Sequence, residues 1–238
     1  MKTLDMEDDR ITTGCDALDD LLGGGFERGT VTQLYGPPGA GKTNVALSAS
    51  VEVAADEGTA VYVDTEGLSV ERFRQVLEAT ADDPAAAAER IVVSEAHDFE
   101  EQAEAVRDVA EFAERADLVV LDSATGFYRL ERGSDTRGGD SLRRIADQIT
   151  HLLSLARKHD LAIVVTNQVY TDPDSESGRA RPLGGHTLEH WTGTVVRLER
   201  FRGDKRRATL EKHRAKPTGD HAQFEITDAG IESVDEHR

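Results

Sequence analysis

The chain has 238 residues and a formal net charge of −18, with 46 acidic residues against 28 lysines and arginines. Its length suits one large domain, and no apolar run approaches the roughly 20 residues that a membrane span needs. The acidic N-terminus has no signal-peptide core, and Cys15 has no partner for an internal disulfide. We therefore expect a cytoplasmic protein with no membrane association.

The kind of charge is also informative. Lysine is rare, and Asp and Glu together outnumber all cations. A chain this acidic repels itself in ordinary buffer, but in molar salt the screening length falls to about 3 Å and the repulsion is largely removed. We interpret the composition as adaptation to a salty cytoplasm; the alternative is an ordinary acidic protein.

Helices and strands alternate along the first two thirds of the chain. Thr13 and Asp16 have the spacing of a capping box, and apolar periodicity identifies the later elements. In chain order the pattern predicts a helix over 16–22, a strand over 29–36, a helix over 42–56, a strand over 59–67, a helix over 69–80, a strand over 90–96, a helix over 99–116, a strand over 117–126, a helix over 140–159 and a strand over 161–170. Continuous apolar strands between helices are typical of a parallel sheet covered on both faces.

The chain changes character after Tyr170. Residues 171–185 are too polar and too rich in glycine to pack, so we expect a mobile loop. Three closely spaced strands follow, over Thr194–Phe201, Arg206–Lys212 and Gln223–Ile226. The predicted fold is therefore α/β, with a mostly parallel central sheet flanked by helices and a C-terminal antiparallel extension.

The segment GPPGAGKT matches the phosphate-binding pattern G-x-x-x-x-G-K-[ST], and it lies between a predicted strand and a predicted helix. Its backbone amides and the helix N-terminus would hold phosphates, Lys42 would reach the β and γ phosphates, and the Thr43 hydroxyl would ligate Mg²⁺. The pattern predicts ATP and Mg²⁺ as cofactors. The predicted nucleotide contacts are Gly36, Pro37, Pro38, Gly39, Ala40, Gly41, Lys42, Thr43 and Asn44.

Three polar residues follow buried strands, where ligands bind in such sheets. Asp122 would assist Mg²⁺ through water; alternatively it is an ordinary strand-end acid or helix cap. Glu66, which we favour over Asp64, would orient the attacking water; alternatively it is a surface carboxylate. Gln168 would sense the γ-phosphate and signal to the loop that follows; alternatively it only makes a strand-end hydrogen bond.

These motifs, in this order, resemble the RecA-type recombinase superfamily. The resemblance rests on TTGCDALDDLLGGGFERG, GPPGAGKT, DTEG, LVVLDS and VVTNQV. It covers about Thr12 to Ile231 and is closest to the archaeal RadB group, the short paralogues of the recombinase RadA. It implies a single RecA-like P-loop ATPase domain over 12–231, between short tails at 1–11 and 232–238.

The resemblance also assigns roles to arginines. The segment ERFRQV resembles the family segment whose arginine packs on adenine, which points to Arg72; alternatively Arg72 is a solvated helix residue. Two loops would line a DNA channel, where each cation adds salt-dependent affinity; alternatively their arginines pair with neighbouring acids. The predicted DNA contacts are Arg129, Arg132, Arg137, Arg179 and Arg181.

Two departures from the superfamily bear on function. Only about eleven residues precede the core, so no helix-hairpin-helix domain is expected there, and the Phe-x-x-Ala tether of filament formers is absent from the sequence. Both favour the RadB group over an autonomous strand-exchange protein. The expected function is an ATP-binding DNA repair and recombination protein, a mediator of RadA with weak Mg²⁺-dependent ATPase activity.

The expected partners are RadA and single-stranded or branched DNA, with a Holliday-junction resolvase and self-association through an ATP interface as further candidates. A KaiC-like signalling ATPase is the alternative, because such proteins share the GPPGAGKT opening. They usually carry paired acids after the second strand, whereas this chain has DTEG. A nucleotide-bound scaffold without turnover is a third hypothesis.

The strip Arg197–Lys216 is basic within an acidic chain, with nine lysines and arginines against three acids. The segment LEKHR resembles a Lys-x-Arg finger that reaches the γ-phosphate of a neighbouring subunit, which points to Lys212 and Arg214 as trans catalytic residues. The predicted hairpin before it would contact DNA or an acidic partner; alternatively its charges keep it soluble and pair with the acidic surface. The hairpin cations are Arg202, Lys205, Arg206 and Arg207.

Overall fold

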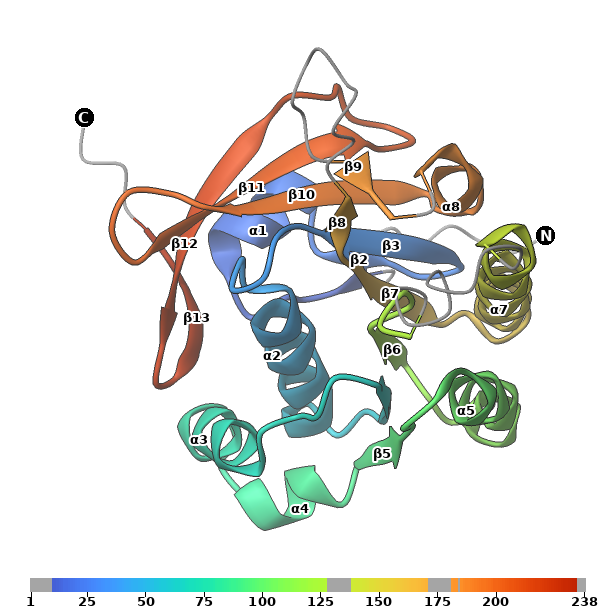
Figure 1. Cartoon of the computed structure of the whole chain (residues 1–238). Coiled ribbons are helices and arrows are strands. Elements are labelled where there is room, and N and C mark those ends of the chain that lie inside the picture. Colours follow the sequence, from blue (N-terminus) through green and yellow to red (C-terminus); the bar gives the residue numbers. More distant parts are fainter. Residues whose placement is uncertain (1–9, 128–137, 171–180, 184, 235–238) are drawn as a thin grey trace, which may run out of the picture.

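The computed structural model describes residues 10–127, 138–170, 181–183 and 185–234. Figure 1 shows a central sheet with helices on both faces. The described helices are α1 (Asp16–Leu22), α2 (Lys42–Ala55), α3 (Val70–Thr80), α4 (Pro84–Ala88), α5 (Phe99–Phe112), α7 (Gly138–His159) and α8 (Gly185–Trp191). The described strands are β1 (Arg10–Ile11), β2 (Phe26–Glu27), β3 (Thr30–Tyr35), β4 (Ala60–Asp64), β5 (Ile91–Glu95), β6 (Leu118–Asp122), β7 (Ala162–Asn167), β8 (Val169–Tyr170), β9 (Arg181–Pro182), β10 (Thr194–Arg200), β11 (Lys205–Lys212), β12 (His221–Thr227) and β13 (Gly230–Ser233).

The main sheet has nine strands in the order β13-β12-β11-β10-β3-β7-β6-β4-β5. The strands from β10 to β5 run parallel, and β10 to β13 form an antiparallel extension. Strands β3, β4, β6 and β7 are buried along their whole length, as expected for parallel strands covered on both faces. The predicted fold class is confirmed.

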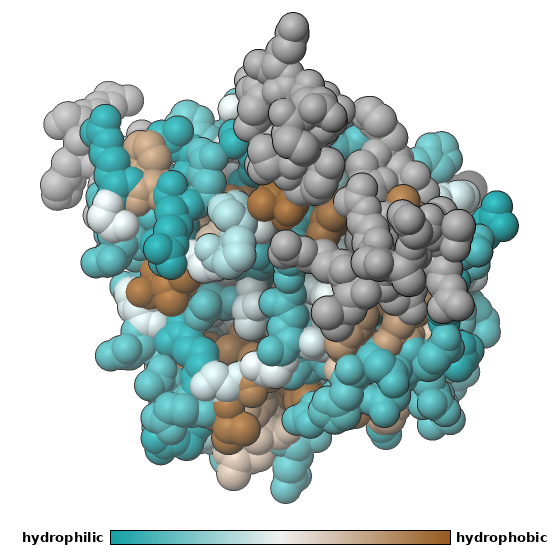
Figure 2. Space-filling view, viewed as in Figure 1, coloured by the Kyte–Doolittle hydropathy of each residue, from teal (hydrophilic) through white to brown (hydrophobic). Residues whose placement is uncertain are grey.

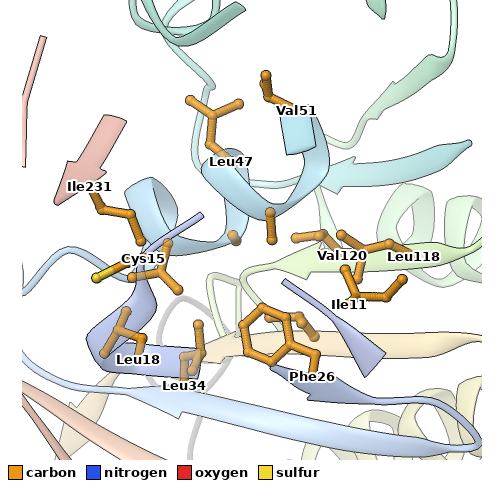
Figure 3. Close-up of a cluster of buried hydrophobic side chains, with 14 of the residues drawn as sticks. Ile11, Cys15, Leu18, Phe26, Leu34, Leu47, Val51, Leu118, Val120 and Ile231 are labelled. Atoms are coloured by element: carbon orange, nitrogen blue, oxygen red, sulfur yellow. The ribbon is translucent and has the colours of Figure 1, made fainter. Parts of the chain in front are cut away.

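Two apolar layers cover the two faces of the sheet. Because side chains alternate along a strand, Val120 belongs to one layer, and its neighbours Val119 and Leu121 belong to the other. The first layer contains residues of α1, α2, α3 and the C-terminal strands, and Figure 3 shows part of it around Phe26, Cys15 and Ile231. The second contains residues of α5, α7 and α8.

The N-terminal end of α1 differs from the predicted capping box. The helix occupies the predicted residues, but its N-cap is Cys15, without a side-chain cap. Thr13 instead bonds the backbone of Cys15, and its own amide donates to Asp19 Oδ1 at 2.8 Å. The helix ends at Gly23, whose φ of 85° is left-handed, the conformation that glycine adopts without strain.

The short outer strands were not predicted. Strands β1 and β2 pair with each other, and β13 pairs with β12, so the folded region reaches from Arg10 to Ser233. Strands of two to four residues are too short to show a clear hydrophobic period. In the described part of the chain, no helix combines the length and apolar character that a membrane crossing demands. Among the residues coloured by hydropathy in Figure 2, hydrophilic ones predominate on this face.

Candidate nucleotide-binding site

The predicted phosphate loop connects β3 to α2, and glycines are required at its close approaches. A Cβ on Gly36 would lie 2.1 Å from the carbonyl oxygen of Leu198 in β10. Gly39 and Gly41 have φ values of 72° and 99°, which favour glycine. The Gly41 Cα also faces Phe224 and Ile226 of β12, to which an added Cβ would be 3.4 and 3.2 Å away. The loop is therefore supported by the C-terminal strands as well as by its own helix.

Lys42 is buried beneath this loop. Its Nζ donates to the carbonyl oxygens of Gly36 at 3.0 Å and Pro37 at 3.2 Å. Burial lowers the pKa of the Lys42 ammonium, while the charges of Glu66 and Asp122 raise it. Lys42 also lines a cavity of about 180 Å³ next to the loop. The cavity is lined by Pro38, Gly39, Gly41, Lys42, Thr43, Asn44, Glu66 and Gln168.

Asp122 lies at the end of β6 and is only 1% exposed. It accepts hydrogen bonds from the hydroxyls of Tyr62, at 2.7 Å, and Thr166. Burial raises the pKa of the Asp122 carboxyl, and hydrogen bonds from Thr166, Tyr62 and Thr43 oppose that shift. Sequence reasoning missed Tyr62 and Thr166, although both are polar residues in the strands that flank β6.

The structure separates the roles of Asp64 and Glu66. The buried Asp64 carboxylate accepts from the amides of Glu66, Gly67 and Leu68, at 3.1, 3.0 and 2.5 Å, and so holds the turn after β4. The exposed Glu66 carboxylate instead accepts from Ser123 Oγ at 2.8 Å and Gln168 Nε2 at 2.9 Å. Glu66 is therefore the acid of this pair that faces the phosphate-loop cavity.

Gln168 connects this cavity to the chain beyond β7. Its carbonyl oxygen accepts from the Leu183 amide at 2.9 Å. The neighbouring Asn167 donates from Nδ2 to the Leu183 carbonyl at 2.8 Å and accepts from Thr125 Oγ1 at 2.7 Å. The two ends of the predicted mobile loop are thus tied together beside Gln168; residues 171–180 lie outside the described part of the chain.

The motif set and this geometry agree with comparisons to known proteins. Residues 7–234 match the Rad51 family. The chain belongs to the Rad51 family. It is 72% identical over 228 residues to the DNA repair and recombination protein RadB of Halobacterium salinarum, covering 96% of this chain and 97% of that protein. RadB of Methanococcoides burtonii is 40% identical over 232 residues, covering 97% of this chain and 100% of that protein.

A solved structure supports the same assignment. A crystal structure of the RadB recombinase matches with a TM-score of 0.78 and 37% identity, covering 94% of this chain and 100% of that one. The predicted resemblance to the RadB group is therefore confirmed, and the Halobacterium relative fits the salt-adapted composition. These matches give no support to the KaiC-like alternative.

In this Rad51-family chain, Arg72 links α3 to the C-terminal hairpin. It donates from Nε to Asn44 Oδ1 at 2.8 Å, from Nη1 to the Thr227 carbonyl at 2.6 Å, and from Nη2 to the Gly230 carbonyl at 2.8 Å. Burial lowers the pKa of its guanidinium, and the charge of Asp228 raises it. Arg72 is therefore not a freely solvated helix residue; its packing on adenine stays a prediction.

We expect Arg72→Ala to lower the free energy of unfolding by about 1–2 kcal/mol, because several partly buried acceptors lose their donors. Urea unfolding in molar KCl measures this. Arg74→Ala is the control on the same helix, since Arg74 makes only exposed ion pairs with Glu71 and Glu78, and should leave stability nearly unchanged. Equal effects of the two variants would contradict the bridging role of Arg72.

The other predicted cations have different locations. Arg129, Arg132, Arg137 and Arg179 lie outside the described residues, and Arg181 begins β9. Lys212 Nζ donates to the carbonyls of Glu189 and Thr192, at the C-terminal end of α8. Arg214 Nη2 donates to Thr30 Oγ1 at 3.2 Å, at the start of β3. The phosphate loop follows the other end of β3, roughly 20 Å away for a six-residue strand.

Proposed function

We propose that this chain is an ATP-dependent accessory protein of DNA repair and recombination, in line with its similarity to the DNA repair and recombination proteins RadB. It would bind ATP with Mg²⁺, associate with the main recombinase RadA and with single-stranded or branched DNA, and hydrolyse ATP slowly. Strand exchange by this chain alone is not part of the proposal. The observation that carries it is the cavity in which Lys42, Glu66 and Gln168 meet under the phosphate loop.

Each residue of the cavity would have a distinct task. The amides of the loop would bind the phosphates, and Lys42 would exchange its carbonyl acceptors for phosphate oxygens. Thr43 and Asp122 would hold Mg²⁺, which when bound neutralises phosphate charge and polarises the terminal phosphoryl group. Glu66 would orient the attacking water. The hydroxyls of Tyr62 and Thr166 would keep the Asp122 carboxylate directed towards the metal position.

Gln168 would sense whether a γ-phosphate is present. A phosphate that binds the Gln168 amide would compete with Glu66 for its Nε2 donor. Since the Gln168 carbonyl is bonded to the Leu183 amide, a shift of Gln168 would move both ends of the loop that carries Arg179 and Arg181. ATP binding would in this way change the DNA affinity contributed by that loop.

Self-association would complete the site in trans. Arg214 lies at the far end of β3 from its own phosphate loop, and Lys212 is held by the Glu189 and Thr192 carbonyls. Both would therefore act on a nucleotide held by a neighbouring subunit. Here Lys212 would first have to leave the α8 carbonyls that it contacts. A Holliday-junction resolvase remains a further candidate partner, and Arg129, Arg132 and Arg137 would contribute to the DNA surface.

Co-purification of the full chain with RadA tests the proposal. The experiment is performed in molar KCl, with and without ATP and Mg²⁺, and with and without single-stranded DNA. We expect association that ATP strengthens, because the loop and the trans contacts depend on the phosphates. Bovine albumin in place of RadA controls for nonspecific contacts. Absence of association with RadA and with DNA in every state would exclude the mediator function.

A further inference from the structure

Two arginines of the β10–β11 hairpin, the exposed Arg200 and the half-buried Arg206, lie on the face of the sheet that carries the first apolar layer. Side chains alternate along a strand, so Arg200 lies on the same face as Leu198, and Arg206 lies on the same face as Ala208. Leu198 and Ala208 both belong to the layer that contains α2. The two arginines are thus the last members of inward-facing rows, at the point where those rows reach the phosphate loop.

Both guanidinium groups contact that loop within the same chain. Arg206 Nε donates to the Gly39 carbonyl oxygen at 3.1 Å, and Arg200 Nε donates to the same oxygen at 3.4 Å. A Cβ on Gly39 would lie 2.5 Å from Arg200 Nη2. Strand β10 also lies close to the loop, because a Cβ on Gly36 would be 2.1 Å from the Leu198 carbonyl oxygen. Two cations therefore lie over the middle of the loop that would bind phosphates.

The charges of this pair are not neutralised in the described part of the chain. Arg200 and Arg206 lie directly opposite each other in the register, a placement that is unfavourable for like charges. Within the described part of the chain, the partners of Arg206 besides Gly39 are the carbonyls of Asp204 and Lys205, at 2.6 and 3.2 Å. Neither arginine has an ion pair there, so both retain N–H donors for an anion.

On the opposite face of the same hairpin, the arginines lie close to carboxylates. Arg197 pairs with Glu199 at 2.8 Å and with Glu211 at 3.1 Å. Arg207 lies 4.0 Å from Glu199 and 3.8 Å from the centre of the Phe201 ring. The hairpin therefore matches its arginines with carboxylates on one face and leaves them unmatched on the face that meets the phosphate loop.

We propose that Arg200 and Arg206 bind the terminal phosphate of a nucleoside triphosphate held in the phosphate loop of their own chain. The proposal rests on the nucleotide site described above. Guanidinium groups present forked donors that match phosphate oxygens, and an arginine supplied in cis can stabilise the charge of a transferring phosphoryl group. A diphosphate lacks the group that they would bind, so this pair distinguishes ATP from ADP. Arg206 is thereby assigned to nucleotide binding rather than to DNA or an acidic partner.

The test compares the affinities of the full chain for a non-hydrolysable ATP analogue and for ADP, each with Mg²⁺, by titration calorimetry. We expect Arg200→Gln with Arg206→Gln to weaken analogue binding at least about tenfold, because hydrogen bonds to charged groups are lost, and to change ADP binding less than about twofold. Unchanged ADP affinity also shows that the variant is folded. Arg197→Gln is the control, because it removes the same charge from the other face of β10.

Three results would overturn the proposal. Equal weakening of analogue and ADP binding would mean that the arginines support the loop rather than the terminal phosphate. Unchanged binding of both nucleotides, with weaker binding of a labelled single-stranded oligonucleotide, would place them on a DNA surface. Absence of nucleotide binding by the unmodified chain would overturn the nucleotide site as well, whereas the first two results leave that site intact.

Discussion

Lys42→Ala is expected to abolish measurable ATP binding, with a loss of roughly 100-fold or more in affinity. The buried ammonium donates to the Gly36 and Pro37 carbonyls of the loop. Because Lys42 also lines the cavity, phosphates held there would meet this cation. Titration calorimetry with ATP and Mg²⁺ in molar KCl measures the loss. The same variant should no longer show ATP-strengthened association with RadA.

Glu66→Gln is the matched comparison for Lys42→Ala. Glu66 lines the same cavity, but its proposed task is to orient water and not to hold phosphate. We expect it to retain ATP affinity within a few-fold and to lose phosphate release, followed with a phosphate-binding dye. If Lys42→Ala binds ATP normally, the loop is not the nucleotide site. If the unmodified chain releases no more phosphate than Glu66→Gln, the chain is a nucleotide-bound scaffold.

Phe26→Ala is expected to lower the free energy of unfolding by about 3–5 kcal/mol. The Phe26 ring is 1% exposed and lies among Ile11, Leu34 and Val120 in the first apolar layer, as Figure 3 shows. Removing it leaves a cavity between the short β1–β2 pair and the main sheet. Urea unfolding in molar KCl, with circular dichroism as the signal, measures the change.

Val70→Ala provides the control for Phe26→Ala. Val70 is 80% exposed at the start of α3, so its truncation should change stability by less than about 0.5 kcal/mol. A decrease of less than about 1 kcal/mol in the free energy of unfolding for Phe26→Ala would contradict the prediction. It would mean that the first apolar layer repacks to fill the space left by the ring. Both variants should bind ATP while folded, since neither residue lines the phosphate-loop cavity.

The parallel core and the phosphate loop could be predicted from the sequence because their signals are local. The buried strands β4, β6 and β7 contain apolar runs, and the loop pattern identifies both its own residues and the strand β3 that precedes it. The choice of Glu66 over Asp64 agrees with the geometry, since Asp64 is engaged by three amides. That engagement could not be predicted, because both carboxylates follow the same strand and the turn decides which one faces the cavity.

The contributions from distant segments could not be predicted. Arg206 belongs to a hairpin whose charge suggested a nucleic-acid surface. Its position in the alternation of side chains along β11, together with the pairing of β10 with β3, instead places it beside the phosphate loop. The sequence pointed to Arg72 as an adenine contact, with a helix surface residue as the alternative, but it could not show that Arg72 donates to carbonyls more than 150 positions later in the chain. Such contacts depend on pairing between segments that are distant in the sequence, and no local sequence pattern indicates that pairing.

The packing of β12 beside Gly41 has a consequence for the order in which the protein folds during synthesis. During synthesis the N-terminal part of a chain emerges first, so the phosphate loop and α2 leave the ribosome long before Phe224 and Ile226, which pack beside Gly41. Arg72 likewise meets the Gly230 carbonyl only after this later segment has been made. A nascent or prematurely terminated chain thus carries the whole phosphate-binding motif without the strands that hold its shape. The shape of the phosphate loop therefore depends on a segment made about 180 residues later, beyond the motif itself.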